Sequence, residues 1–75
     1  MPIKPDKLPL VVKENIIGAY DTNEATAIID ALENMRGSYT DKEGKTRKCG
    51  WNLDHYYIMR GNMYVGIELD GYMHT

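Results

Sequence analysis

The stretch that decides the fold is Asp54–Gly71, DHYYIMRGNMYVGIELDG. Two segments rich in Tyr, Ile, Met and Val, residues 55–60 and 63–69, flank the pair Gly61-Asn62. A glycine followed by a small polar residue is typical of a two-residue turn between antiparallel strands. Such a turn also sets the register, because it pairs each residue before it with the mirror position after it. The sequence therefore predicts a β-hairpin over residues 55–69.

The predicted hairpin has two different faces, because side chains alternate across a sheet. One face matches an apolar core: Tyr56, Ile58, Met63, Val65, Ile67 and Leu69. The other face is aromatic at its centre and polar at its rim: His55, Tyr57, Met59, Tyr64, Glu68 and Asp70. Tyr combines apolar area with a hydroxyl group that seeks water or a partner, so it suits half-exposed contact surfaces.

Three interpretations of this second face are open. It forms a second small core under the N-terminal segment, a homodimer interface, or a binding site for a foreign protein. The abundance of Tyr and Met favours the foreign protein, since both residues give large and adaptable contact area. On this interpretation Tyr57, Met59 and Tyr64 are the anchors, and His55, Arg60 and Glu68 form the rim.

Residues 21–37, DTNEATAIIDALENMRG, predict an amphipathic helix. Asp21 or Thr22 can cap the first turn, and Glu24 stands where a capping box places an acidic residue. An apolar stripe recurs at steps of three and four residues: Ala25, Ile28, Ile29, Leu32 and Met35. Gly37 is expected to take the left-handed position that stops the helix.

The remaining segments complete an α+β prediction. Residues 1–9 hold three prolines and predict an extended arm. Residues 10–20 are rich in Val and Ile and favour strand, although helical spacing fits part of them. Residues 38–49 predict a second hairpin that turns at Asp41–Gly44. We therefore expect one domain over residues 10–75, with one amphipathic helix on an antiparallel sheet of about three to five strands.

Length and composition limit the classes of function. A chain of 75 residues buries a small core, so self-association as a homodimer is a reasonable way to bury more surface. Its single cysteine, Cys49, excludes an internal disulfide and fits a reducing compartment. The chain has no apolar run long enough to span a membrane and no signal-peptide pattern. We therefore expect a cytoplasmic protein without a membrane partner.

The sequence predicts neither catalysis nor a cofactor. His55 lies opposite Glu68 in the expected register, but no motif places a Ser or Cys nucleophile beside them. Cys49, His55, His74 and Asp54 lack the close spacing of a metal motif, so no metal site is expected. The glycines at 61, 66 and 71 do not form a phosphate-binding loop.

A basic segment supports a second class of function, nucleic-acid binding. Residues 42–48, KEGKTRK, can follow a phosphate backbone while nearby aromatic rings stack on bases. The candidate residues are Lys42, Lys45, Arg47, Lys48, Tyr39 and Trp51. The acidic helix and the net charge of −2 favour instead a solvated hairpin whose charges protect an edge strand.

Residues 44–58, GKTRKCGWNLDHYYI, resemble the Gly-Lys…Gly-Trp-Asn segment of small phage Thoeris anti-defence proteins. The similarity covers about a fifth of the chain, and the hairpin before it and the short C-terminus depart from that pattern. The resemblance implies sequestration of a small nucleotide-derived signal, with Trp51 and Asn52 as the candidate contacts.

The function that the sequence favours is a small non-enzymatic regulator or inhibitor that binds another protein. A phage or mobile-element origin, with a role in host takeover or anti-defence, fits such a product. Nucleic-acid binding and capture of a nucleotide-like ligand are the alternatives.

Overall fold

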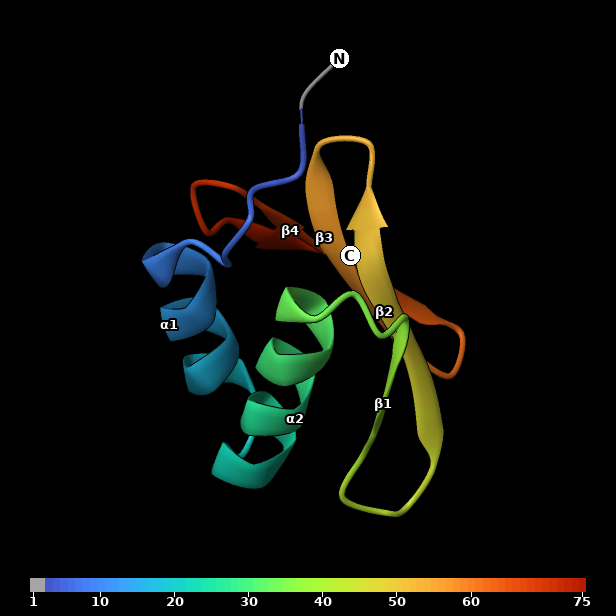
Figure 1. Cartoon of the computed structure of the whole chain (residues 1–75). Helices are drawn as coiled ribbons and strands as arrows, with labels where there is room; N and C mark the ends of the chain where they lie inside the picture. Colours follow the sequence, from blue (N-terminus) through green and yellow to red (C-terminus); the bar gives the residue numbers. More distant parts are fainter. Residues whose placement is uncertain (1–2) are drawn as a thin grey trace.

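Five antiparallel strands form one sheet in which each strand pairs with its neighbour in the sequence (Figure 1). The computed structural model describes residues 3–75, so the first two residues of the predicted arm lie outside it. The elements are α1 (Leu10–Ala19), α2 (Thr22–Glu33), β1 (Ser38–Thr40), β2 (Thr46–Asn52), β3 (His55–Arg60), β4 (Met63–Glu68) and β5 (Met73–His74). The predicted α+β class and antiparallel sheet are confirmed, but the sheet carries two helices instead of one.

The β3–β4 hairpin has the predicted register. Arg60 pairs with Met63 and His55 pairs with Glu68, and the pairs between them follow in order. Gly61 has a φ of 63°, a left-handed conformation that glycine adopts without strain. The predicted β1–β2 hairpin is also present, and Gly44 supplies the positive φ in its turn.

Residues 10–20 form a helix, so the preference for a strand was wrong. Pro9 precedes α1, and its carbonyl oxygen accepts hydrogen bonds from the amides of Val12 and Lys13. Val12 and Ile16 are fully buried, and their four-residue spacing places them on the same side of the helix. Packing of this side against the rest of the core outweighs the β-propensity of Val and Ile, which depends strongly on context.

Helix α2 begins as predicted and ends earlier than predicted. The Asp21 carboxylate accepts a hydrogen bond of 2.8 Å from the Glu24 amide and caps the first turn. At the other end, the Arg36 amide donates to the Ala31 carbonyl, and the Met35 amide donates to the Leu32 carbonyl. This pattern is a Schellman motif in which Met35, with φ of 52°, takes the left-handed position expected for Gly37.

Replacing Met35 with Gly should stabilise the protein by about 0.5 to 1 kcal/mol, because glycine adopts the left-handed conformation without a steric penalty. The Met35 side chain is 73% exposed, so little packing is lost. Urea denaturation measures the change, and Met35→Ala is the control that keeps a side chain at this φ. An equal stability of the glycine and alanine variants would contradict this account of the helix end.

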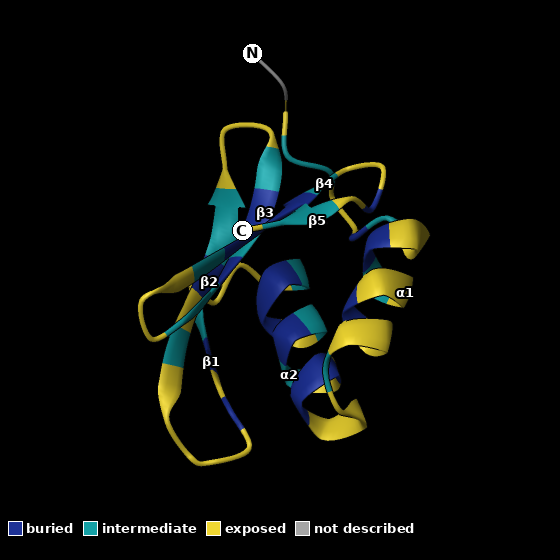
Figure 2. Ribbon diagram, turned by 180° about the vertical axis from the view of Figure 1, so that it is seen from behind, coloured by how far each residue is buried: buried dark blue, intermediate teal, exposed yellow. Residues whose placement is uncertain are grey.

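Both helices lie on one face of the sheet, and their buried sides point toward it (Figure 2). The core between the layers contains Leu8, Val12, Ile16, Ala25, Ile28, Ala31, Leu32, Tyr39, Cys49, Tyr56, Ile58, Val65 and Ile67. Four of the six predicted core residues of the hairpin are therefore buried. Met63 and Leu69 are exposed, because they lie at the two ends of β4, beyond the cover of the helices.

Candidate functional site

The sheet face turned away from the helices is called the outer face here. Its residues follow from the strand pairing, since they alternate with the buried ones: Lys48, Gly50, His55, Tyr57, Met59, Tyr64, Gly66, Glu68 and His74. The two views of the ribbon place both helices on the opposite side (Figures 1 and 2). The arm is also directed toward the helix side, where Lys4 lies 5.8 Å from the ring centre of the buried Tyr56.

Two stacked tyrosines form the centre of the outer face. The rings of Tyr57 and Tyr64 are 5.9 Å apart and nearly parallel, at 8°. Tyr57 also lies against the backbone of Gly50, where an added Cβ would come within 3.2 Å of its ring. Met59 pairs with Tyr64 across the hairpin and extends this apolar centre. All three anchor side chains are half-buried by one another and by the strands, yet each has surface open to solvent.

The end of the outer face near the β2–β3 turn carries two contacts between a histidine and a carboxylate. His55 Nδ1 is 3.2 Å from Asp54 Oδ1, and His74 Nε2 is 3.4 Å from Glu68 Oε1. The Nε2 atom of His55 is hydrogen-bonded to the Tyr64 hydroxyl group. Both imidazole rings lie over Gly66, where a Cβ would come within 2.7 Å of His74. The absence of a side chain at Gly66 therefore leaves room for both rings in this arrangement.

Asp54, His55 and Tyr64 are hydrogen-bonded in series, in the order of a catalytic triad: a carboxylate that orients a histidine, a histidine that acts as a base, and a hydroxyl group. Because a carboxylate only accepts, Nδ1–H of His55 donates to Asp54, and a neutral ring then accepts the Tyr64 proton at Nε2. Cys49, the only cysteine, is fully buried on the helix side of the sheet and cannot act as the nucleophile. Burial raises the pKa of the Cys49 thiol to about 11, which keeps it protonated and unreactive at neutral pH.

We expect the free energy of unfolding to fall as the pH rises from about 9 to about 11, by up to about 1.4 kcal/mol per pH unit from Cys49. As the pH rises, the Cys49 thiol loses its proton in the unfolded chain before it does so in the folded protein. The contribution of the buried thiol to stability is therefore complete below the pKa of the unfolded chain and is lost as the pH rises through the pKa of the folded protein. Burial likewise raises the pKa values of Tyr20, Tyr39 and Tyr56. Urea denaturation at successive pH values measures the slope. An unchanged slope in Cys49→Ala would refute the role of the thiol.

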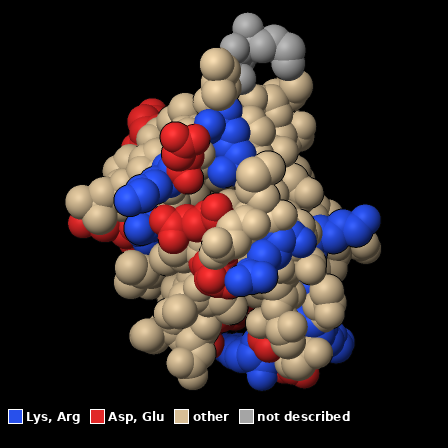
Figure 3. All heavy atoms as spheres, in the orientation of Figure 1, with Lys and Arg blue, Asp and Glu red and all other residues tan. Residues whose placement is uncertain are grey.

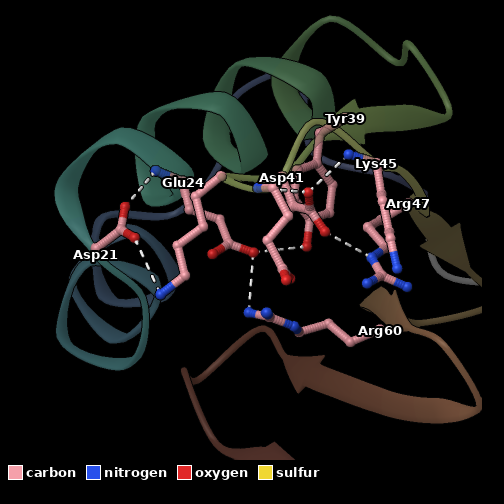
Figure 4. Close-up of polar contacts among 9 residues, drawn as sticks. Asp21, Glu24, Tyr39, Asp41, Lys45, Arg47 and Arg60 are labelled. Carbon is pink, nitrogen blue, oxygen red and sulfur yellow. Dashed lines mark hydrogen bonds and ion pairs between the residues drawn. The ribbon is translucent and has the colours of Figure 1, made fainter.

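Arg60 does not lie on the rim of the outer face, and that prediction was wrong. Its guanidinium group points to the helix side and lies 2.9 Å from the Glu24 carboxylate. The Tyr39 hydroxyl donates to the same Glu24 oxygen at 3.1 Å, so side chains from α2, β1 and β3 converge there (Figure 4). Arg60 also lies 5.8 Å from the ring centre of Tyr20. A capping box accounts for the sequence position of Glu24, but its side chain is buried in this network.

The candidate nucleic-acid residues are not brought together. Arg47 is on the helix side, 2.8 Å from the buried Asp41 carboxylate (Figure 4). Tyr39 is buried, and Trp51 packs edge-on against Tyr56, so neither ring is free to stack on a base. Lys42 and Lys45 are exposed in the hairpin turn, and Lys48 is exposed on the outer face. In the view of Figure 3, Lys and Arg side chains alternate with Asp and Glu instead of forming one positive surface.

Asp41 organises the β1–β2 turn. Its carboxylate accepts hydrogen bonds from the amides of Glu43 and Lys45 and from Arg47 Nε. Burial alone would raise the pKa of Asp41, but these hydrogen bonds together with the Arg47 charge hold it below the usual value. Arg47 therefore has a structural role as the partner of Asp41, and this role explains the residue without any contact to a nucleic acid.

The two candidate contacts for a small ligand point in opposite directions. Trp51 faces the helix side, whereas Asn52, the next residue of the strand, has the opposite orientation and is exposed. A hollow of about 190 Å³ lies beside Trp51, lined by Lys4, Leu32, Met35, Gly37, Cys49, Gly50 and Tyr57. It is smaller than the roughly 300 to 1,000 Å³ typical of small-molecule pockets.

His74 was not among the predicted site residues, apart from a dismissed metal cluster. It joins the outer face because β5 pairs with β4, which places it opposite Gly66. The sequence signal that could have revealed this position is Gly71, a turn residue that lets the chain fold back and pair residues 73–74 with β4.

No protein-family model, curated protein or solved structure matches the chain. The similarity of residues 44–58 to Thoeris anti-defence proteins therefore stays a prediction. None of the helices within residues 3–75 is long and apolar enough to cross a membrane.

Proposed function

We propose that this chain is a small non-enzymatic regulator or inhibitor that binds another protein through its outer face. The observation that carries the proposal is the stacked Tyr57–Tyr64 pair on the sheet face opposite both helices. The rings are already held in place by each other and by Gly50, so little side-chain entropy is lost on binding. Tyr is among the residues most enriched in the centres of protein interfaces.

The charges around the tyrosines indicate the chemistry of the partner. Lys48 lies at one end of the outer face, whereas Asp54 and Glu68 lie at the other end. A complementary partner surface has an apolar or aromatic centre between an acidic end and a basic end. Such an arrangement fixes the orientation of the partner and raises the rate of association.

The test is affinity capture from a lysate of the source cells, with and without nuclease, followed by mass spectrometry. Wild-type protein and the variant with both Tyr57→Thr and Tyr64→Thr are compared, since Thr keeps the strand propensity while removing the rings. The proposal predicts a stoichiometric protein that the wild type retains and the variant loses. The matched control is Ile17→Ser, which removes an exposed apolar side chain from the helix side.

Other outcomes contradict the proposal. If a protein binds the double tyrosine variant as well as it binds the wild type, it uses another surface. Recovery that disappears with nuclease supports nucleic-acid binding by residues 42–48. If nothing besides the chain itself is recovered, self-association or capture of a small ligand becomes the leading account of the chain, and the outer face loses its claim to a foreign protein.

A further inference from the structure

We propose that Asp54, His55, Glu68 and His74 form a binding site for a divalent transition-metal ion, with Zn²⁺ the best match. Donor atoms of Asp54, His55 and Glu68 lie within 4.8 Å of one another. His74 Nε2 lies 3.4 Å from Glu68 Oε1, so a fourth donor adjoins one member of this group. Both histidines of the chain are therefore at one spot, although they are far apart in the sequence.

The distances suit a tetrahedral zinc site. Zinc-to-ligand bonds of about 2.0 to 2.1 Å place neighbouring tetrahedral donors about 3.3 Å apart. The separations of 3.2 Å between His55 and Asp54 and 3.4 Å between His74 and Glu68 are close to this value. The rings of His55 and His74 have centroids 6.0 Å apart, and rotation of the His74 side chain would bring it to the same ion as the other three donors. Two imidazoles and two carboxylates also form a donor set that Zn²⁺ accepts.

The surroundings support the site in two ways. Histidine ligands commonly donate their second N–H group to a neighbouring oxygen, which orients the ring. Tyr64 is placed for this role: when Nδ1 of His55 binds the ion, the ring proton moves to Nε2, which then donates to the Tyr64 hydroxyl group instead of accepting from it. The glycine at position 66 leaves room for both rings, and its Cβ would collide with His74. The ligand side chains are partly exposed, so an ion reaches them from solvent.

The contacts of His55 with Asp54 and of His74 with Glu68 give the competing explanation of the cluster, in which they only stabilise this end of the sheet. The two explanations differ in what happens when metal is added. A metal site binds Zn²⁺ with a defined stoichiometry and stabilises the folded state by mass action. Ion pairs alone give no selective binding.

The test is isothermal titration calorimetry of the full chain with ZnCl₂, after removal of any histidine tag. We expect one Zn²⁺ ion to bind per chain and to raise the melting temperature. MgCl₂ should bind more weakly or not at all, because Mg²⁺ prefers oxygen ligands. CoCl₂ is a second probe, because tetrahedral Co²⁺ has intense visible absorption bands. His55→Ala and His74→Asn should each lower the affinity for Zn²⁺ at least about 10-fold, and Tyr64→Phe should lower it by about 10-fold.

The matched control is Asp30→Asn, which removes an exposed, ion-paired carboxylate on the helix side. It should leave Zn²⁺ binding unchanged. Circular dichroism verifies that each variant is folded, and His74→Asn changes only the short last strand. The proposal is overturned if the wild type does not bind Zn²⁺, if Mg²⁺ binds equally well, or if folded His74→Asn binds Zn²⁺ as tightly as the wild type. These results do not depend on a protein partner, so they leave the proposed function to its own test.

Discussion

Replacing Tyr57 and Tyr64 together with Thr is expected to weaken binding of the captured partner at least about 30-fold. This factor corresponds to the roughly 2 kcal/mol that defines a single hot-spot residue, and the two rings are adjacent anchors of one surface. The rings stack 5.9 Å apart and face away from both helices, so their loss removes contact area from the outer face and not from the core. Calorimetry with the purified partner measures the change.

The stability of the same variant distinguishes a binding surface from a second core. Loss of a cross-strand aromatic pair should lower the free energy of unfolding by about 1 to 2 kcal/mol and leave the circular dichroism spectrum unchanged. Unfolding of the double variant would mean that the tyrosines hold the fold together. Ile17→Ser provides the comparison, since it alters the opposite side of the molecule and should keep full affinity.

Arg60→Met is expected to lower the free energy of unfolding by about 2 to 3 kcal/mol. The Glu24 side chain is 2% exposed, and without Arg60 its carboxylate is left in the core with the Tyr39 hydroxyl as its hydrogen-bond partner. Removing one member of a buried ion pair commonly costs about 3 to 5 kcal/mol, and the partial exposure of Arg60 reduces this value. The substitution also removes the contact with Tyr20 that fixes the loop between the helices.

A matched exposed pair gives the control for Arg60. Arg36 contacts Asp30 at 2.8 Å, but both side chains are more than half exposed. Arg36→Met should therefore change the stability by less than about 0.5 kcal/mol. Urea denaturation of the two variants measures the difference, and equal losses would show that burial of Glu24 has no special energetic role. Glu24→Gln, which keeps the shape and an acceptor for Arg60, should be milder than Arg60→Met.

The parts of the fold that were predictable have strong local signals. The Gly61 turn and the alternation of apolar residues on each side of it specify the β3–β4 register. Asp21 and the apolar stripe specify the start and the buried side of α2. Helix α1 was missed because Val and Ile favour strands when only local propensity is considered. The spacing of Val12 and Ile16 becomes decisive only when α2 and the sheet provide a core.

The candidate site was predictable to the same extent. Alternation alone placed His55, Tyr57, Met59, Tyr64 and Glu68 on one face, and the structure has them there. Arg60 has the orientation of Ile58, so the alternation itself assigns it to the inner face, where Glu24 attracts it. Neither the Glu24 network nor the position of His74 is visible in the sequence, because each depends on contacts between distant segments.

The measurement that tests the binding surface most directly is NMR of the chain with labelled methionine methyl groups, titrated with the unlabelled captured partner. Met59 lies beside Tyr64 on the outer face, whereas Met73 pairs with Ile67 and packs against the core on the helix side. The proposed function predicts that the Met59 methyl signal shifts and broadens while the Met73 signal keeps its position. A shift of Met73 with an unchanged Met59 would place the partner on the helix side and contradict the outer face as the binding surface.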